Sequence, residues 1–401
     1  MELSNVPMSP ARPASVPQAV VGRKRRAAKA MSISEMRSLA RLTLPGPVFD
    51  LADGGAGDGS GLSRNVDLLR AYRFHPRVLT GVSQPDQSSA LFGRRYASPF
   101  GISATGMAGL FWPHADRLLA QAAQAANIPF LLSTCSSGTL EDVASVAGEN
   151  LWFQLYPARD PGVTDAMVAR ADRAGVNVLV VTVDWPVAPR FEIVSVARRN
   201  DRWRRVVEAV RHPRWAMRYM RAGQPLFGNW RAFAPADADA AGIATYAATQ
   251  WPCAQSWDDI ARIRDIWNRT LVLKGVAHPD DALRAASMGV DGVIVSNHGG
   301  KAHARFPATT EMLTSVKAAV GDRIVVMADG GVEHGADAAV LKCLGADFSF
   351  FGRATLYGAG AGGLAGIERV IALMREDVEH LLMQIGCQSF EALDRSFLME
   401  T

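Results

Sequence analysis

A histidine and an aspartate follow two apolar segments of the chain and together could act as a general base. His298 lies in SNHGG (296–300), where the neighbouring glycines would allow a ligand to approach closely. Asp184 ends TVD (182–184), directly after the apolar run VLVV. A carboxylate beside an imidazole fixes its tautomer and raises its basicity, which suits proton abstraction. The alternative is a histidine with a structural role only.

A lysine and an arginine in similar positions could bind an anion. Lys274 ends LVLKG (271–275), and the apolar pattern places its side chain inside the fold. A lysine there either forms a Schiff base or stabilises a developing negative charge. DGG (329–331) and Gly352–Arg353 follow two more apolar segments, and backbone amides next to an arginine are typical of phosphate sites. The sequence thus predicts a phosphate site near a base and a buried cation.

These residues need a scaffold that brings the ends of many strands together. Short apolar, β-rich segments alternate with Ala-rich segments whose apolar residues recur at helical spacing. The β-rich segments are 98–105, 128–134, 150–156, 178–184, 271–276, 292–297, 323–330 and 348–353. Apolar strands separated by helices indicate a parallel sheet buried on both faces, and eight such units close a barrel. An open doubly wound sheet is the alternative, but the first strand lacks the glycine-rich turn of a dinucleotide fold.

We therefore predict an α/β fold, a (β/α)8 TIM barrel with a long insertion after its fourth strand. Polar side chains stand at the C-terminal end of nearly every predicted strand, which is the face that carries the active site in this fold. They are Ser103, Thr105, Ser133, Gln154, Tyr156, Thr182, Asp184, Lys274, Ser296, Asn297, His298, Asp329 and Arg353.

Composition excludes several other classes of protein. The 401 residues are 48% hydrophobic and 20% charged, as in a globular protein with a sizeable core. Four distant cysteines without a CxxC pair argue against a disulfide scaffold or a structural zinc site and fit a reducing cytosol. The net charge of +4 is too small to indicate a nucleic-acid partner. The sequence contains no run of eighteen apolar residues, so no membrane span is predicted. No metal site is expected either.

Two segments lie outside the repeating pattern. Residues 1–30 are rich in proline and end in a basic cluster, which predicts a disordered tail before a barrel domain of residues 31–401. Residues 186–260 form the insertion, and within it 197–230 combines many arginines with Trp, Met and Val. That composition suits either a helix on an anionic membrane surface or a lid over the barrel mouth. Both interpretations stay open.

The chain resembles the family of FMN-dependent 2-hydroxy-acid oxidases and dehydrogenases, which includes glycolate oxidase, L-lactate dehydrogenase and mandelate dehydrogenase. The similarity extends from about residue 34 to about 398, and its motifs occur in the family's order. They include YRFHPRVL (72–79), SATGM (103–107), LWFQLY (151–156), TVDWP (182–186), VIVSNHGG (293–300), MADGGVEHGAD (327–337) and FGRATLYG (351–358). GLFWP (109–113) and LMQIGC (382–387) resemble the mandelate and lactate dehydrogenases more than the plant-type oxidases.

The resemblance implies FMN as cofactor and gives each site residue a role. His298, oriented by Asp184, would remove the substrate proton, and Tyr156 would point at the substrate. Lys274 would stabilise the anionic reduced flavin. The residues expected to bind the cofactor are Ala104, Thr105, Gly106, Ser133, Gln154, Thr182, Lys274, Ser296, Asp329, Gly330, Gly331, Gly352 and Arg353.

The positions that bind the substrate carboxylate in this family differ here. The family's substrate tyrosine aligns with Leu51, and the arginine expected after NHGG is Lys301. The second substrate arginine aligns with Phe191, with Arg190 next to it. We therefore expect Tyr156, Arg190 and Lys301 to bind the substrate. In place of the family's planar, bidentate guanidinium, this chain has the point charge of the Lys301 ammonium group and the displaced Arg190.

Two further positions differ from the family. Ala304, three residues after Lys301, stands where the family has an aspartate, and Glu333 stands where the family has an arginine after DGGV. Weak binding of lactate and glycolate is therefore expected, and the lost tyrosine and aspartate leave room for a larger substrate. The predicted reaction is FMN-dependent oxidation of a lactate-like, mandelate-like or larger 2-hydroxy acid to the 2-keto acid. A flavin-dependent tailoring oxidase of a modified peptide or natural product, or a degraded flavin-binding barrel, are the alternatives.

The expected partners follow from the same resemblance. The electron acceptor would be oxygen, a quinone or a protein carrier, and the resemblance implies a homo-oligomer, namely a tetramer. The expected location is the cytoplasm, with a possible peripheral contact of residues 197–230 with the inner face of the membrane.

Overall fold

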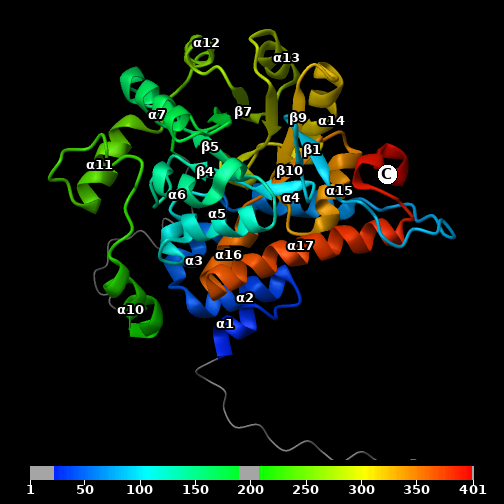
Figure 1. Ribbon diagram of the computed structural model, residues 1–401, viewed down its shortest axis with the longest axis horizontal. Helices are drawn as coiled ribbons and strands as arrows, with labels where there is room; N and C mark the ends of the chain where they lie inside the picture. Colours follow the sequence, from blue (N-terminus) through cyan, green and yellow to red (C-terminus); the bar gives the residue numbers. More distant parts are fainter. Residues whose placement is uncertain (1–21, 189–206, 209, 400–401) are drawn as a thin grey trace, which may run out of the picture.

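The computed structural model describes residues 22–188, 207–208 and 210–399, which form a closed barrel of eight parallel strands inside a ring of helices (Figure 1). The strands are β3 (Phe100–Ile102), β4 (Phe130–Ser133), β5 (Leu151–Leu155), β6 (Val178–Thr182), β7 (Thr270–Val276), β8 (Gly292–Val295), β9 (Val325–Asp329) and β10 (Phe348–Phe351). Each pairs with its chain neighbour, and β10 pairs with β3. The predicted TIM barrel and its eight strands are confirmed.

The strands are apolar throughout because successive side chains enter two different cores. Alternate residues such as Leu131, Val180 and Val272 point into the barrel, whereas Leu132, Leu179 and Leu271 pack outward against the helices. Burial on both faces removes the alternation of polar and apolar residues that a strand with one solvated face shows. The barrel interior is therefore packed with side chains, and a ligand can enter only at an end.

A hairpin of β1 (Ser89–Leu91) and β2 (Arg94–Tyr96) closes the N-terminal end of the barrel. Leu91 and Tyr96 are buried in the same apolar cluster as the barrel interior. The Trp152 indole, near the start of β5, donates a hydrogen bond to the Tyr96 hydroxyl at 3.3 Å. The C-terminal end thus remains the open end of the barrel.

The outer helices begin at residues suited to helix starts. Asp160 caps the helix that starts at Pro161, and Ser256 forms a capping box with Asp259. The ring comprises α5 (Ala115–Ala125), α6 (Leu140–Ala147), α7 (Pro161–Arg173), α12 (Trp257–Ile266), α13 (Pro279–Ser287), α14 (Thr309–Val320), α15 (Gly335–Cys343), α16 (Arg353–Gly362) and α17 (Leu364–Gln384). Each helix follows a barrel strand or, like α17, extends the last one.

Between residue 22 and the barrel, the structure has four helices: α1 (Gly22–Ala27), α2 (Ile33–Thr43), α3 (Gly46–Asp53) and α4 (Ser60–Ala71). The first three lie together beside α16 in Figure 1. Ala27 and Ala30 are fully buried, and a Cβ at Gly360 would lie 2.6 Å from Leu44 Cδ1, so small residues let these helices approach closely. Within the predicted tail, Gly22–Ala27 is thus helical and packed, and the domain boundary at residue 30 stays a prediction. Residues 1–21 lie outside the described residues.

The insertion between β6 and β7 contributes α10 (Pro213–Ala222) and α11 (Ala240–Gln250), which lie to one side of the barrel in Figure 1. The Trp215 indole donates to the Leu110 carbonyl at 3.0 Å and the Tyr219 hydroxyl donates to the Gly109 carbonyl. α12, which starts at Trp257 within the predicted insertion of residues 186–260, packs on α7 as a ring helix. Within the described residues, no helix is long and apolar enough to cross a membrane.

Candidate active site

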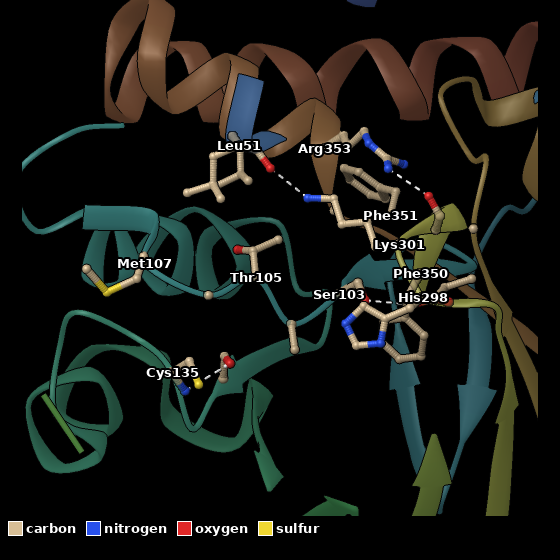
Figure 2. Close-up of a pocket in the computed structure, with 18 of the residues that line it drawn as sticks. Leu51, Ser103, Thr105, Met107, Cys135, His298, Lys301, Phe350, Phe351 and Arg353 are labelled. Carbon is tan, nitrogen blue, oxygen red and sulfur yellow. Dashed lines mark hydrogen bonds between the residues drawn. The ribbon is translucent and has the colours of Figure 1, made fainter. Parts of the chain in front are cut away.

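A cavity of about 420 Å³ opens at the C-terminal end of the barrel, where the sequence predicted the site. Figure 2 shows side chains from separate strands and from α3 turned toward it. Its walls include Leu51, Ser103, Ala104, Thr105, Gly106, Met107, Ser133, Tyr156, Lys274, His298, Lys301, Asp329, Gly330, Gly331, Gly352 and Arg353. Residues at or just after the C-terminal ends of β3, β4, β5, β7, β8, β9 and β10 thus line a single cavity.

His298 is held between a carboxylate and a phenol. Its Nδ1 lies 3.0 Å from Asp184 Oδ1 and its Nε2 lies 3.2 Å from the Tyr156 hydroxyl. Backbone geometry makes room for this contact, because a Cβ at Gly275 would lie 2.4 Å from Asp184 Cβ. His298 itself has a φ of +59°, a left-handed conformation that is uncommon for residues other than glycine. The predicted pairing of His298 with Asp184 is observed in the structure.

The two contacts define the roles of the ring nitrogens. A carboxylate accepts hydrogen bonds, so the Nδ1–H of His298 donates to Asp184, and Nε2 carries the lone pair. Burial, followed by the nearby Cys135 and Asp184, raises the pKa of Tyr156 well above its ordinary value. Tyr156 therefore keeps its proton and donates toward Nε2. An imidazole in this state can accept a proton at Nε2.

Lys274 and Asp329 form an ion pair beneath the cavity. Lys274 Nζ lies 2.7 Å from Asp329 Oδ2 and 3.0 Å from the Ser296 hydroxyl, and Ser103 donates to the same carboxylate oxygen at 2.8 Å. Burial by itself would raise the pKa of Asp329, but Lys274 and these hydrogen bonds lower it below its ordinary value. A Schiff base needs an unpaired neutral amine, so the ion pair favours the charge-stabilising role for Lys274.

Ser133, Gln154 and Thr182 form a hydrogen-bonded row across three neighbouring strands. The Ser133 hydroxyl donates to Gln154 Oε1 at 3.0 Å, and Gln154 Nε2 donates to the Thr182 hydroxyl at 2.9 Å. All three side chains are buried, and Ser133 reaches the cavity wall. Ser133 therefore presents a fixed polar group to the cavity, whereas Gln154 and Thr182 lie behind it and are not among the lining residues. These are the residues expected to contact the edge of a flavin ring.

Several features of the cavity fit the hydroxylated chain and the phosphate of FMN. Asp329 Oδ1 is buried and has no hydrogen-bond partner within the described residues, which leaves an acceptor for a hydroxylated ligand. Gly330 and Gly331 have φ of +104° and +83°, and a Cβ at Gly331 would lie 2.9 Å from Asn65. Arg353 is partly buried and bonds only to backbone carbonyls in the described structure, with Ala52 O at 2.9 Å and Gly299 O at 2.7 Å. An anion would compensate this partly buried charge.

Lys301 also lines the cavity, next to Leu51. Its Nζ donates to the Leu51 carbonyl at 2.7 Å, and Figure 2 shows Arg353 beside it. Burial, with a further contribution from Arg353 that Asp53 opposes, lowers the pKa of Lys301 to about 7. Arg190 and Phe191, the other positions of the predicted clamp, lie outside the described residues. A substrate role for Lys301 stays a prediction.

The two other departures from the family lie near this end of the cavity. Glu333 lines the cavity and forms an ion pair with Arg70 at 3.0 Å, so its charge has a partner. Ala304 packs against the turn before α4, where a Cβ at Gly57 would lie 3.2 Å from the Ala304 Cβ.

Sequence reasoning missed an aromatic wall beside His298. Trp185 lies with its ring centroid 4.1 Å from that of His298, and Trp251 lies 4.3 Å from Tyr156. Phe111 and Phe227 also line the cavity. Trp185 directly follows Asp184 and could have been found from that position alone. Trp251 and Phe227 come from the insertion and carried no local signal.

Comparison with known proteins identifies the family of this fold and site. The model of the FMN-dependent dehydrogenase family matches residues 40–400. An L-lactate dehydrogenase of Caulobacter vibrioides is 37% identical over 377 residues, which cover 92% of this chain and 97% of that protein. The (S)-mandelate dehydrogenase of Pseudomonas putida is 33% identical over 376 residues, which cover 92% of this chain and 93% of that protein.

Solved structures agree with these matches. A crystal structure of the monotopic membrane protein (S)-mandelate dehydrogenase aligns with a TM-score of 0.88 at 33% identity and covers 93% of this chain and 100% of that chain. A mandelate oxidase with (S)-4-hydroxymandelic acid aligns with a TM-score of 0.77 at 30% identity, covering 92% and 98% of the two chains. This chain therefore belongs to the FMN-dependent dehydrogenase family.

Proposed function

We propose that this protein oxidises a 2-hydroxy acid with an aryl or other large apolar side chain to the 2-keto acid, using FMN. The aromatic wall carries the proposal. Tyr156, Trp185 and Trp251 lie with His298 on one side of the cavity, so an apolar substituent there would be buried next to the base. Burial of a phenyl-sized group contributes about 1.5–3 kcal/mol, which a methyl group cannot supply.

His298 is the proposed base. Its Nε2 accepts a proton from the substrate while Asp184 holds Nδ1 and stabilises the imidazolium that forms. Tyr156, which keeps its proton, then donates a hydrogen bond to the substrate oxygen instead of to His298. Bound FMN supplies the acceptor for the two electrons. The intact hydrogen bonds around His298 argue against a degraded flavin-binding barrel.

The cofactor would lie between the two polar ends of the cavity. Lys274 would stabilise negative charge on the flavin, since the protein already holds its ammonium group in place through Asp329. Arg353 and the backbone of Gly330 and Gly331 would hold the phosphate. The unpartnered Asp329 Oδ1 would accept a hydrogen bond from a ribityl hydroxyl.

Lys301 is the proposed partner of the substrate carboxylate. Its ammonium group has only a backbone carbonyl as hydrogen-bond acceptor in the described structure, and a bound carboxylate would compensate its partly buried charge. One lysine offers a single point charge where an arginine offers two parallel donors. Small acids depend most on that contact, so the weakened clamp and the aromatic wall together favour larger acids.

We also propose a peripheral contact with the cytoplasmic face of a membrane through residues 197–230. In the described part of this segment, Met217 and Met220 on α10 are 43% and 76% exposed, with arginines on the same helix. One similar structure is named a monotopic membrane protein. Flotation of the protein with anionic vesicles would test the contact. Light scattering would test the homotetramer, which rests on family resemblance alone.

The test of the substrate proposal is anaerobic bleaching of the visible flavin band. The second-order rate should be larger for mandelate and phenyllactate than for lactate and glycolate by about tenfold or more, the factor that corresponds to 1.4 kcal/mol of binding. Mandelamide separates the ring from the carboxylate, because it keeps the ring and loses the charge. Equal rates for lactate and mandelate would refute the large-substrate proposal.

A further inference from the structure

His298 uses both of its ring nitrogens in hydrogen bonds, which leaves the faces of the imidazole for other contacts. Nδ1 donates to Asp184 Oδ1 at 3.0 Å, and Nε2 lies 3.2 Å from the Tyr156 hydroxyl. The N–H bond and the lone pair of an imidazole both point along the ring plane. A further group can therefore influence the charge of this ring only from above or below that plane.

The indole of Trp185 lies against this imidazole. The two ring centroids are 4.1 Å apart, and the ring planes are inclined by 54°. Aromatic pairs usually have centroids about 4.5–7 Å apart, so this contact is closer than usual. Two rings that lie side by side in one plane cannot come so near, and the contact therefore involves a ring face. The distance is also well within the limit of about 6 Å from a ring centroid at which an aromatic face attracts a cation.

The backbone and a second indole hold Trp185 in this place. In an extended strand, consecutive side chains point to opposite faces. The chain bends at Asp184, just after β6, and this bend lets both Asp184 and Trp185 reach the same imidazole. Trp251 stacks on Trp185 with centroids 6.0 Å apart and planes inclined by 23°. The position of Trp185 is thus supported from two sides.

The contact gains importance when the base takes up a proton. In the proposed reaction the substrate proton binds Nε2, so the neutral imidazole becomes a positively charged imidazolium. The His298 side chain is only 19% exposed, so water contributes little to stabilising that charge. The face of an indole carries partial negative charge and attracts a cation more strongly than the face of Tyr or Phe does. An aliphatic side chain in the same place would only exclude water, which disfavours the charged form.

We propose that Trp185 is a positioning residue for the base, whose indole face stabilises the protonated form of His298 and so makes Nε2 a better proton acceptor. The inference rests on the proposed role of His298. It gives Trp185 a function that does not depend on the size of the substrate, in addition to its place in the aromatic wall. The usual strength of such contacts corresponds to a factor of about two to thirty in the protonation equilibrium.

Other charged groups also act on His298, so the test keeps them constant. Asp184 and Tyr156 face the ring nitrogens. The 3₁₀ turn η3 (His298–Gly300) packs against α4, whose ionisable residues are Arg64, Asp67 and Arg70. The charged side chains elsewhere in the cavity wall are Asp50, Lys274, Lys301, Asp329, Glu333 and Arg353. All of them are retained in the variants described next, so a difference between variants isolates the contribution of Trp185.

The direct test measures the protonation of His298 in the oxidised holoenzyme. The protein has eight histidines, so labelling histidine with ¹³C at Cε1 gives few NMR signals, and the signal missing from His298→Gln belongs to His298. Trp185→Leu keeps an apolar side chain and removes the aromatic face. In this variant the His298 signal should titrate at a pH lower by about 0.3–1.4, because the protonated form has lost its stabilisation. An unchanged midpoint, or one that moves to higher pH, would overturn the proposal.

A second pair of variants separates the electrostatics of the ring from its shape. Trp185→Phe keeps an aromatic face with a weaker attraction, so its midpoint should lie between those of the wild type and Trp185→Leu. Pentafluorophenylalanine, incorporated at the same position by amber suppression, has nearly the same shape but a face of opposite charge, since fluorine withdraws electron density. Its midpoint should lie at or below that of Trp185→Leu. Equal midpoints for phenylalanine and its fluorinated form would mean that only shape matters and would refute the proposal.

The pH dependence of flavin reduction provides the kinetic readout. The second-order rate should fall at low pH, where His298 is protonated before the substrate binds. In Trp185→Leu this acid limb should move to lower pH, and the plateau rate should fall by about two- to thirtyfold for lactate as well as mandelate, since a weaker base takes the proton.

Trp251→Leu is the matched control in the same wall, because the ring contacts of Trp251 are with Tyr156 and Trp185. This variant should weaken the binding of mandelate and leave the acid limb in place. If Trp185→Leu behaves in the same way, with a loss confined to mandelate and an unmoved acid limb, Trp185 has no role in proton transfer.

These results can be separated from those that test the proposed function. The NMR titration uses the oxidised holoenzyme without substrate, so it reports on Trp185 even if no 2-hydroxy acid reduces the flavin. Rapid reduction by mandelate that depends on His298, together with equal midpoints in the wild type and Trp185→Leu, would support the proposed function and refute the role of Trp185.

Discussion

Two lysines line the same cavity and differ in their partners. Lys274 is paired at 2.7 Å with the Asp329 carboxylate and also contacts Ser296. Lys301 has the carbonyl of Leu51 at 2.7 Å, and burial lowers its pKa to about 7. The fold supplies the counterion of the first lysine, whereas the second would obtain one from a bound carboxylate. The charge of Lys274, in the proposed cofactor site, is thus balanced within the protein, and the charge of Lys301 would be balanced by the proposed substrate.

The largest expected effect comes from replacing His298, the proposed base. His298→Gln should leave both lysines in place and bind FMN with an unchanged spectrum, yet slow flavin reduction by roughly 10²–10⁴-fold, the usual contribution of a general base. Stopped-flow reduction by mandelate measures the rate, and absorbance measures flavin occupancy. Near wild-type reduction would mean that another group takes the proton.

Removal of the paired lysine should affect the whole protein. Lys274→Met leaves Asp329 buried without its cation, and breaking a buried pair typically costs about 3–5 kcal/mol. Thermal unfolding of the holoenzyme should therefore occur at a lower temperature, and flavin should dissociate more readily. The double variant Lys274→Met with Asp329→Asn should recover part of the stability. An unchanged melting temperature in the single variant would contradict the account of this ion pair.

Removal of the other lysine should affect ligands and not stability. Lys301→Met should weaken the binding of carboxylate substrates by about 1.5–3 kcal/mol, the range for a hydrogen bond to a charged group. Mandelamide should be affected much less, because it lacks the charge. The melting temperature should stay the same or rise, since no protein carboxylate loses a partner. A similar loss for mandelate and mandelamide would remove Lys301 from the carboxylate site.

The smallest expected effect is a change in the pH profile. The pKa of Lys301 is lowered to about 7, so the free enzyme carries this charge below that pH and loses it as the pH rises. The kcat/KM for mandelate should therefore fall on the alkaline side from about pH 7. Lys301→Arg should move that limb upward, because arginine stays protonated, and should help lactate by about 1 kcal/mol. A profile that is identical in both proteins would assign the alkaline limb to another group.

The meeting of the proposed cofactor residues in one cavity could be predicted from sequence because they lie at the ends of strands. Asp329, Lys274 and Ser133 each close an apolar run, and barrel closure alone brings such positions together. The wall of the cavity could not be predicted in this way. Trp251 reaches Tyr156 from an insertion, and Lys301 meets Leu51 from 250 positions away along the chain. No local pattern specifies contacts of this kind.

The packing of the N-terminal residues could not be predicted from sequence either. Composition marks residues 22–30 as a basic, solvated segment, but the buried face of Ala27 and Ala30 depends on the glycines of α16. A helix of small residues carries little hydrophobic signal, since its packing energy comes from close approach and not from large side chains. Such docking becomes visible only when both partners are placed.

The hairpin that closes the N-terminal end of the barrel has a kinetic consequence. With Leu91 and Tyr96 sealing that end, reactants and products exchange only on the opposite side of the molecule. If acid and acceptor shared one passage there, the keto acid would have to leave before the acceptor entered, and double-reciprocal plots would give parallel lines. Separate passages allow both to be present at once, and the lines then intersect. Intersecting lines in an initial-rate experiment would therefore indicate separate passages.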